Sequence, residues 1–122
     1  MKGASIFLVE DEALIRMMIV EMLEELGHRV VAEAGSIDTA EPLARTSVFD
    51  LAVFDINVAG FNISPIAEIV AARSLPFVFV SGYGPASRPA LFADKPVLHK
   101  PFLLEHVADM INWAMGDKSK GQ

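Results

Sequence analysis

Four charged side chains follow short apolar runs that have the composition of buried β-strands. Glu10 and Asp11 follow the first run, Asp55 ends the third, and Lys100 follows the last. If these strands are parallel, their carboxyl ends share one edge of the sheet, which is where open sheets bind their ligands. Three carboxylates and one ammonium would leave an excess of negative charge that one divalent cation cancels. Because the available ligands are oxygens, Mg2+ is the expected cation.

Asp55 is the candidate nucleophile of this cluster. A carboxylate oxygen can attack phosphorus and form an aspartyl phosphate. Positioning and charge stabilisation provide most of the catalysis in phosphoryl transfer, so we expect the cation and Lys100 to balance the charge on the transferring oxygens. Ser81, at the end of the fourth predicted strand, can donate a hydroxyl hydrogen bond to the attached phosphoryl group.

Each of these residues also has an ordinary structural interpretation. An acidic run before a helix stabilises the helix N-terminus, and Asp55, Ser81 and Lys100 are residue types that occur in turns at strand ends. No single residue therefore specifies the chemistry. The prediction rests on all of them falling at the carboxyl ends of successive strands, with the acids before the base.

Strand-like and helix-like segments alternate along the whole chain. This alternation is typical of an α/β fold with a doubly wound parallel sheet. The second and fifth strands are the more polar, and Pro96 opens the fifth, so both are predicted to lie at the edges of the sheet. The strands are predicted over residues 5–9, 29–33, 50–54, 77–80 and 97–99.

Two helices show the periodicity of a single buried face. The first is predicted to end at Gly27 and the last at Gly116, because glycine commonly follows a helix C-terminus. The inward-facing positions are Ile15, Ile19, Met22, Leu23 and Leu26 in the first helix, and Leu103, Val107, Met110, Ile111 and Ala114 in the last.

Proline and glycine constrain the other helices. Ser64 is predicted to cap the third helix, with Pro65 at the first helical position. Pro42 is acceptable only in a first turn, so the cap of the second helix is predicted to lie no earlier than Thr39. Two glycines and two prolines within residues 82–94 predict that the fourth helix is short or irregular.

Length and composition limit the classes of protein to consider. At 122 residues the chain fits one domain, predicted over residues 1–116 with a polar tail at 117–122. The lack of cysteine excludes disulfides, thiolate-bound zinc and a cysteine nucleophile. A net charge of -6 with scattered basic residues disfavours nucleic acid, and no apolar run reaches the roughly 18 residues of a membrane span. Acidic residues stand where a signal peptide would have its cleavage site, so a cytoplasmic location is expected.

Four short motifs resemble the signature set of bacterial two-component response-regulator receiver domains. The resemblance covers residues 4–116 and implies a flavodoxin-like (βα)5 fold with strand order 2-1-3-4-5. The motifs are Leu8-Val9-Glu10-Asp11-Glu12, Phe54-Asp55-Ile56-Asn57, Val80-Ser81-Gly82 and His99-Lys100-Pro101-Phe102.

The resemblance implies a metal-binding set and a phosphoacceptor. Glu10 and Asp11 would be the acidic pair that binds Mg2+, and Asp55 would be both a metal ligand and the phosphoacceptor. Asn57 would bind the metal through its backbone carbonyl. Many receivers have a proline four residues after the phosphoacceptor, whereas this chain has Ala59, so the loop geometry is expected to differ.

The resemblance also implies switch residues. Ser81 would be the switch hydroxyl, and Lys100 would bind the phosphoryl group. Receivers usually carry an aromatic switch three places before this lysine, but Val97 stands there and is too stiff and small for that role. The fourth strand instead resembles the subfamily that reads Phe-Ala-Thr-Gly-aliphatic-Tyr. Gly82 and Tyr83 are therefore predicted to take part in the switch, with Tyr83 and residues 84–94 reporting phosphorylation. Asn57 and Tyr83 are predicted to tune the lifetime of the acyl phosphate, because they flank the path by which water would reach it.

These features predict a stand-alone phosphoacceptor domain that catalyses only its own phosphorylation and dephosphorylation. A sensor histidine kinase or a histidine phosphotransfer protein would supply the phosphoryl group, and a downstream protein target would read the resulting conformational change. The domain is expected to bind neither nucleic acid nor membrane and to be a monomer or weak dimer.

Two other functional classes remain open from the residues. One is a magnesium phosphohydrolase similar to haloacid-dehalogenase-like enzymes, which would use Asp55. Those enzymes need a second acid two residues later, and Asn57 stands there instead. The other is a receiver-like interaction module that never takes phosphate, which the full acidic set argues against.

Overall fold

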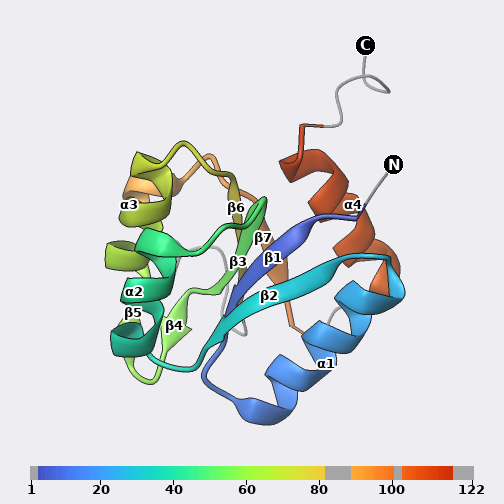
Figure 1. Cartoon of the computed structure of the whole chain (residues 1–122), viewed down its shortest axis with the longest axis horizontal. Coiled ribbons are helices and arrows are strands. Elements are labelled where there is room, and N and C mark those ends of the chain that lie inside the picture. Colours follow the sequence, from blue (N-terminus) through green and yellow to red (C-terminus); the bar gives the residue numbers. More distant parts are fainter. Residues whose placement is uncertain (1–2, 82–88, 101–102, 117–122) are drawn as a thin grey trace.

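The chain folds around a five-stranded parallel sheet with strand order β2-β1-β3-β6-β7 (Figure 1). The computed structural model describes residues 3–81, 89–100 and 103–116. The predicted α/β fold and the order 2-1-3-4-5 are confirmed, and the second and fifth strands lie at the edges. The strands are β1 (Ser5–Val9), β2 (Arg29–Ala34), β3 (Leu51–Asp55), β6 (Phe77–Ser81) and β7 (Val97–His99), and each bound lies within one residue of its prediction.

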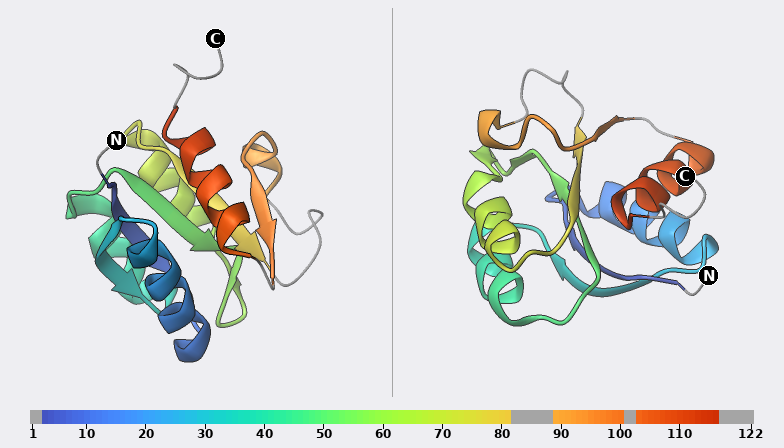
Figure 2. Two further views of the ribbon diagram at one scale, coloured as in Figure 1. Left: turned by 90° about the vertical axis from the view of Figure 1, so that its right-hand side faces the viewer. Right: turned by 90° about the horizontal axis from the view of Figure 1, so that it is seen from above.

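Helices cover both faces of the sheet, as expected for a doubly wound fold (Figures 1 and 2). Successive residues of a strand point to opposite faces. Phe7 and Phe54 therefore pack against the pair α2 and α3, whereas Leu8 and Val53 pack against the pair α1 and α4. The helices are α1 (Ala13–Glu25), α2 (Ile37–Thr46), α3 (Ser64–Ala72) and α4 (Leu104–Ala114).

A row of phenylalanine rings connects the three central strands. The ring centroids of Phe7 and Phe54 are 5.9 Å apart, those of Phe54 and Phe77 are 5.6 Å apart, and those of Phe77 and Phe79 are 5.7 Å apart. All four rings are buried, and each such burial contributes roughly 1.5–3 kcal/mol to stability. The row holds β1, β3 and β6 in register where their carboxyl ends carry polar residues.

The first and last helices bury most of the predicted faces. Residues Ile19, Leu23, Val107, Met110 and Ile111 are buried, and the other predicted positions except one pack half-buried against the same core. The exception is Leu103, whose prediction was wrong. It is the N-cap residue of α4, and its side chain is 59% exposed because the first helical turn begins only after it. Among the described residues, no helix combines the length and the apolar character that crossing a membrane requires.

The second helix starts earlier than predicted. Its N-cap is Ser36, whose hydroxyl oxygen accepts a hydrogen bond from the backbone N–H of Thr39 at 3.2 Å. Pro42 therefore lies inside the helix, and its missing N–H removes one hydrogen bond to the carbonyl of Asp38. Asp38 is exposed, so water can solvate that carbonyl, and the good cap at Ser36 supports the turn before the proline.

The third helix is not capped by Ser64. Its N-cap is Ile63, and Ser64 is already the first helical residue, followed by Pro65. The backbone N–H of Ser64, at the start of the helix, donates to the side-chain oxygen of Asn62 at 2.9 Å. Asn62 thus provides the side-chain acceptor at this helix end, where the N-cap residue Ile63 has none. Pro65 is therefore the second helical residue and not the first as predicted, but it still lies in the first turn, where no intrahelical partner for an N–H is lost.

A short β-hairpin that the sequence analysis did not predict follows β3. The strands β4 (Asn57–Val58) and β5 (Phe61–Asn62) pair antiparallel. They are joined by Ala59 and Gly60, which have φ angles of 52° and 88°. Two successive residues with positive φ are typical of the tight turns that match strand twist. The usual sequence signal for such a turn is Asn-Gly or Asp-Gly. The turn was not predicted because Ala59 stands at the first position.

The described part of the connection between β6 and β7 contains little helix, as predicted. It holds one 3-10 turn, η2 (Ala90–Phe92). Phe92 is buried with its ring centroid 5.1 Å from that of Phe77, and the ammonium of Lys95 lies 4.8 Å from the Phe77 ring centroid. The predicted switch residues Gly82 and Tyr83 lie outside the described residues.

The left-handed conformation of Ala59 gives a testable prediction about the loop after Asp55. Replacing Ala59 by glycine removes the Cβ that disfavours positive φ, so Ala59→Gly is expected to raise the free energy of unfolding by on the order of 1 kcal/mol. Ala71→Gly, at an exposed position of α3, is the matched control and is expected to lower it by about 1 kcal/mol. Urea denaturation measures both changes, and equal losses at the two positions would contradict the turn geometry.

Candidate functional site

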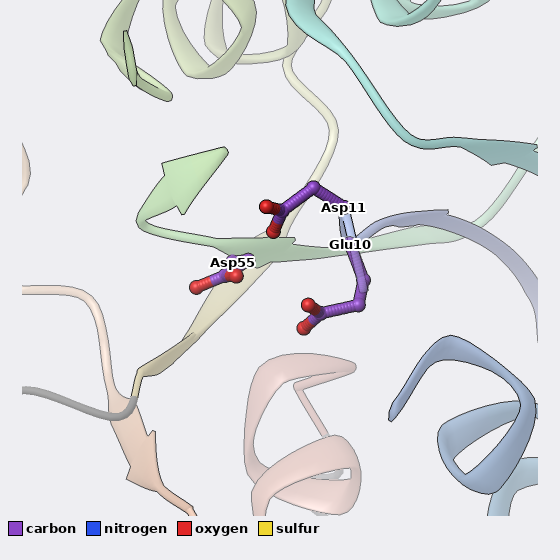
Figure 3. A group of neighbouring side chains, drawn as sticks. All are labelled: Glu10, Asp11 and Asp55. Atoms are coloured by element: carbon purple, nitrogen blue, oxygen red, sulfur yellow. The ribbon is translucent and has the colours of Figure 1, made fainter. Parts of the chain in front are cut away.

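The carboxylates of Glu10, Asp11 and Asp55 meet at the carboxyl edge of the sheet (Figure 3). Strands β1 and β3 are neighbours with Val9 opposite Phe54, so the next residue of each chain segment lies at the same level. One carboxylate oxygen from each of the three acids lies within 4.8 Å of the others. Glu10 and Asp55 are buried, and Asp11 is half-buried.

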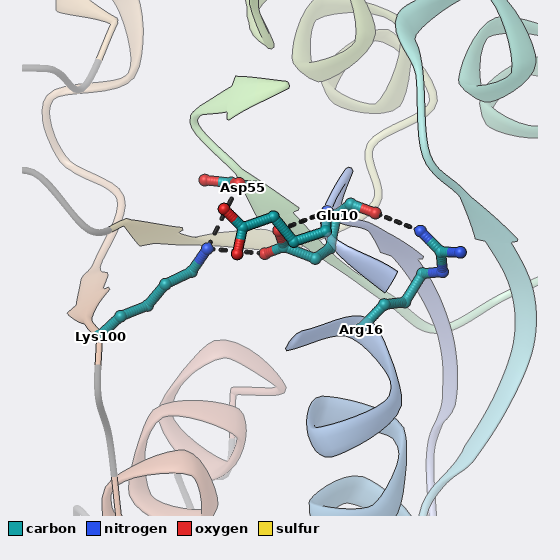
Figure 4. Close-up of polar contacts among 5 residues, drawn as sticks. Glu10, Arg16, Asp55 and Lys100 are labelled. Atoms are coloured by element: carbon teal, nitrogen blue, oxygen red, sulfur yellow. Dashed lines mark hydrogen bonds and ion pairs between the residues drawn. The ribbon is translucent and has the colours of Figure 1, made fainter. Parts of the chain in front are cut away.

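Lys100 reaches the same cluster from the end of β7. Its backbone N–H donates to the carbonyl of Ser81 at 2.8 Å, which continues the β6–β7 pairing past His99. Its Nζ lies 2.8 Å from Glu10 Oε1 and 3.4 Å from Asp55 Oδ2 (Figure 4). The lysine therefore neutralises part of the negative charge that the three acids bring together.

Glu10 is held at its main chain and at its side chain. Its N–H donates to the carbonyl of Ala34 at 3.0 Å, and its Oε2 accepts the N–H of Glu12 at 3.1 Å. Its carbonyl accepts a hydrogen bond from Arg16 Nη1 at 2.6 Å. Arg16 was not predicted as a site residue. It is the one basic residue of α1, but that alone does not reveal that its guanidinium reaches the Glu10 carbonyl.

Burial and charge shift the pKa values of Asp55 and Lys100. Burial, followed by the charge of Glu10, raises the pKa of Asp55 to about 7, although Lys100 and the backbone N–H of Asn57 act in the opposite direction. Burial lowers the pKa of Lys100, but its hydrogen bond to Glu10 and the negative charges of Asp55 and Glu10 outweigh that effect and leave it above the usual value. Lys100 is thus a fixed cation, whereas Asp55 needs further positive charge to ionise fully at neutral pH.

A polar cavity of about 420 Å3 opens beside Asp55. A water molecule takes about 30 Å3 of liquid volume, so the cavity has room for a phosphoryl group with several waters. The hairpin between β4 and β5 forms part of its wall. The lining residues are Asp11, Glu12, Asp55, Asn57, Ala59, Gly60 and Lys100.

Ser81 lies at the adjacent strand end. It is buried, and it is the last residue of β6, one place after Val80, which pairs with Asp55. Among the described residues, the structure therefore brings every predicted site residue to one edge of the sheet, with Asn57 on the cavity wall.

The acidic cluster fits a Mg2+ ion. Oxygen ligands lie about 2.0–2.1 Å from Mg2+, so two of them around one ion are roughly 3–4 Å apart. The three acidic oxygens, all within 4.8 Å of one another, need only small side-chain adjustments to reach that spacing. Each carboxylate oxygen has two lone pairs, so the hydrogen bonds that Glu10 already accepts leave it able to bind a cation or its water.

Comparisons with known proteins agree with this geometry. The transcriptional regulatory protein PdtaR of Mycobacterium tuberculosis is 37% identical over 79 residues, which are 64% of this chain and 38% of PdtaR. The chain therefore spans well under half the length of that relative. SdrG of Sphingomonas melonis Fr1 is 37% identical with a TM-score of 0.82 over 93% of this chain and 96% of SdrG. A BeF3-activated conformation of SdrG has also been solved. The anti-anti-sigma factor PhyR of Bartonella quintana is 27% identical with a TM-score of 0.81 over 99% of this chain and 51% of PhyR.

The family model described as the response regulator receiver domain matches residues 6–112, which include every acid of the cluster and Lys100. The match extends from the second residue of β1 into α4 and so includes all but one residue of the sheet. Both the sequence and the arrangement of the site thus lead to one assignment: the chain belongs to the response regulator receiver domains of two-component systems.

Proposed function

We propose that this domain takes a phosphoryl group onto Asp55 from a phosphohistidine of a partner protein, with Mg2+ bound at Glu10, Asp11 and Asp55. The observation that carries the proposal is the meeting of three acidic oxygens within 4.8 Å beside the Lys100 ammonium. The backbone carbonyl of Asn57 is the proposed fourth ligand from the protein, since Asn57 lines the same cavity.

Asp55 is the proposed nucleophile. One of its carboxylate oxygens forms the new bond to phosphorus, while the bond between phosphorus and the donor imidazole nitrogen breaks and its electron pair stays with the nitrogen. The attack needs the ionised carboxylate, and the raised pKa of Asp55 means that the metal-free site is partly protonated near neutral pH. Bound Mg2+ would supply the positive charge that favours the ionised form and offsets charge on the transferring oxygens.

Lys100 and Ser81 are proposed to bind the attached phosphoryl group. The Lys100 ammonium already lies 3.4 Å from Asp55 Oδ2, so it can donate to a phosphoryl oxygen after a small movement. The buried Ser81 hydroxyl can donate to another from the end of the neighbouring strand. The 2.8 Å hydrogen bond from Lys100 N to the Ser81 carbonyl links the two residues, so movement of one bears on both β6 and β7.

The proposed output is a conformational change that a downstream protein reads. The BeF3-activated conformation of SdrG supports the idea that a phosphoryl-like group changes the state of this type of domain. Tyr83 and residues 84–94 are the proposed reporters, with Gly82 taking part in the switch, because Val97 provides no aromatic switch. The name of PhyR as an anti-anti-sigma factor supports a target that is itself a protein rather than nucleic acid.

The proposed phosphodonor is a sensor histidine kinase or a histidine phosphotransfer protein. In a phosphohydrolase of the haloacid-dehalogenase type the nucleophile would follow the first strand, whereas Asp55 ends β3. The hydrolase alternative therefore gains no support. The domain is proposed to be a signalling domain that catalyses only its own phosphorylation and dephosphorylation.

Phosphorylation itself is the first test. Incubation with Mg2+ and a small-molecule phosphodonor, followed by intact mass measurement, is expected to show one added phosphoryl group on the unchanged protein and none on Asp55→Asn. Asp109→Asn, at an exposed position of α4, is the matched control and should be phosphorylated normally. Phosphorylation of Asp55→Asn to the same extent as the unchanged protein would contradict the assignment of Asp55 as the phosphoacceptor.

Substitution of Lys100 distinguishes phosphorylation of Asp55 from the conformational response that follows it. Lys100→Ala is expected to permit some phosphorylation but to lose the conformational response, because the ammonium that links Asp55 to β7 is gone. Amide chemical shifts of β6 and β7 before and after phosphorylation measure that response, and Lys100→Arg should keep part of it. A full set of shift changes in Lys100→Ala would argue against this role.

The raised pKa of Asp55 predicts a pH-dependent stability difference in the metal-free protein. A group whose pKa rises from 3.8 to about 7 on folding stabilises the fold below pH 4, and that stabilisation is lost as the pH rises through 7. Asp55→Asn should therefore raise the free energy of unfolding little at pH 4 and on the order of 3 kcal/mol at pH 8. Saturating Mg2+ should shrink the difference.

The titration of His28 does not affect the stability difference between the unchanged protein and Asp55→Asn. Burial lowers its pKa, so its protonation destabilises the fold as the pH falls, but equally in the unchanged and substituted proteins. Chemical denaturation at several pH values measures the difference, and a gain that is the same at pH 4 and pH 8 would contradict the electrostatic explanation.

A further inference from the structure

The metal-binding loop is fixed from outside the cavity by one side chain of α1. We infer that Arg16 is a positioning residue for Mg2+ binding, because its guanidinium holds the peptide on which the Glu10 and Asp11 carboxylates are mounted. The inference rests on the proposed function, since it concerns the affinity of that site for Mg2+. Arg16 itself lines no part of the cavity and is not a ligand.

The contacts of Arg16 carry the inference. Its Nη1 donates to the Glu10 carbonyl at 2.6 Å, and its Nε lies 3.3 Å from Glu33 Oε1. Only 25% of the Arg16 side chain is exposed, so this position is partly shielded from water. Figure 4 shows Arg16 and Lys100 reaching Glu10 from opposite sides, one at the main chain and one at the carboxylate.

The hydrogen bond from Arg16 to the Glu10 carbonyl has a charged donor. A hydrogen bond from a charged donor is shorter and roughly twice as strong as one between neutral groups. The Glu10 carbonyl and the Asp11 N–H belong to the same planar peptide unit. The orientation of this peptide therefore fixes the positions of the Cα atoms from which the Glu10 and Asp11 side chains extend. Glu12, the N-cap residue of α1, makes no side-chain capping bond, so capping by Glu12 does not fix the loop.

Gly35 provides the space that the guanidinium occupies. A Cβ placed on Gly35 would lie 3.1 Å from Arg16 Nη1 and 3.8 Å from the Glu10 carbonyl oxygen. Gly35 has no positive φ, so its backbone does not require glycine. The guanidinium is therefore packed against the end of β2 as well as bonded to the end of β1.

Two simpler roles for Arg16 predict different results. If Arg16 acted only through its charge, removing it would make the acidic site more negative and tighten Mg2+ binding. If it only stabilised the fold, the Mg2+ affinity of the folded protein would not change. Positioning predicts the opposite sign from charge, since a loosened loop no longer presents both carboxylates to one ion. The sign of the change in Kd therefore identifies the role.

The test is Mg2+ titration of the full unphosphorylated chain by calorimetry. Arg16→Gln is expected to raise the Kd for Mg2+ about 10-fold, the lower end of the loss seen when groups that orient metal ligands are removed. Arg16→Lys should recover part of the affinity, because an ammonium can still donate to the Glu10 carbonyl. Glu33→Gln is the matched control, since it removes the ion pair and leaves the carbonyl bond, and it should change Kd less than about 2-fold.

Gly35→Ala gives an independent measurement with Arg16 in place. Its methyl group would displace the guanidinium by a few tenths of an ångström, so the Kd should rise in the same direction but less than in Arg16→Gln. If Arg16→Gln fails to fold, Gly35→Ala decides alone by the same criterion. The readout in the absence of metal is faster amide hydrogen exchange at Asp11 and Glu12.

The outcomes separate this inference from the proposed function. Tighter or unchanged Mg2+ binding in Arg16→Gln, with normal binding and phosphorylation of the unchanged protein, overturns the role of Arg16 alone. No Mg2+ binding by the unchanged protein overturns the proposed function. Weaker binding in Arg16→Gln, with phosphorylation that recovers at saturating Mg2+, supports the positioning role.

Discussion

Repulsion between like charges at the carboxyl edge of the sheet is the constraint on which the site depends. At about 4 Å and an effective dielectric constant near 20, two carboxylates repel by on the order of 4 kcal/mol. Glu10, Asp11 and Asp55 are brought within this range, and Lys100 offsets only part of the charge. Burial of Asp55 and, after it, the charge of Glu10 raise the pKa of Asp55. The remaining excess of negative charge gives the site its proposed affinity for a divalent cation.

The sheet is what keeps the acids from separating. Asp55 is the last residue of a strand that is buried along its whole length, and its neighbour Ile56 donates to the carbonyl of Val80 at 3.2 Å. On the other side, Glu10 donates to the carbonyl of Ala34 at 3.0 Å. The phenylalanine row binds the same strands together a few residues earlier. Separating the carboxylates would therefore require breaking strand ends that the core holds in register.

The sequence predicted the strands and most of the site because both depend on local patterns. Continuous apolar runs mark strands buried on both faces, and the charged residues that follow them fall at one edge in any parallel sheet. The errors lay where one local rule competes with another. At Pro42 a good cap at Ser36 outweighed the penalty of an internal proline, and at Ser64 the side chain of Asn62 took over the capping role. Arg16 could not be assigned from the sequence, because its role depends on where the Glu10 carbonyl and Gly35 lie in the fold.

The absence of an aromatic residue at Val97 changes how a signal would leave the proposed phosphorylation site. In the described part of the chain, β6 is connected to the next segment by the contact of Phe77 with Phe92. Phe92 belongs to η2, and its neighbour Leu91 is 72% exposed. A shift of β6 caused by a phosphoryl group on Asp55 would therefore reach the surface through buried rings that start inside the core. Because packed cores have discrete arrangements rather than a continuous range, such a route favours a two-state response over a graded one.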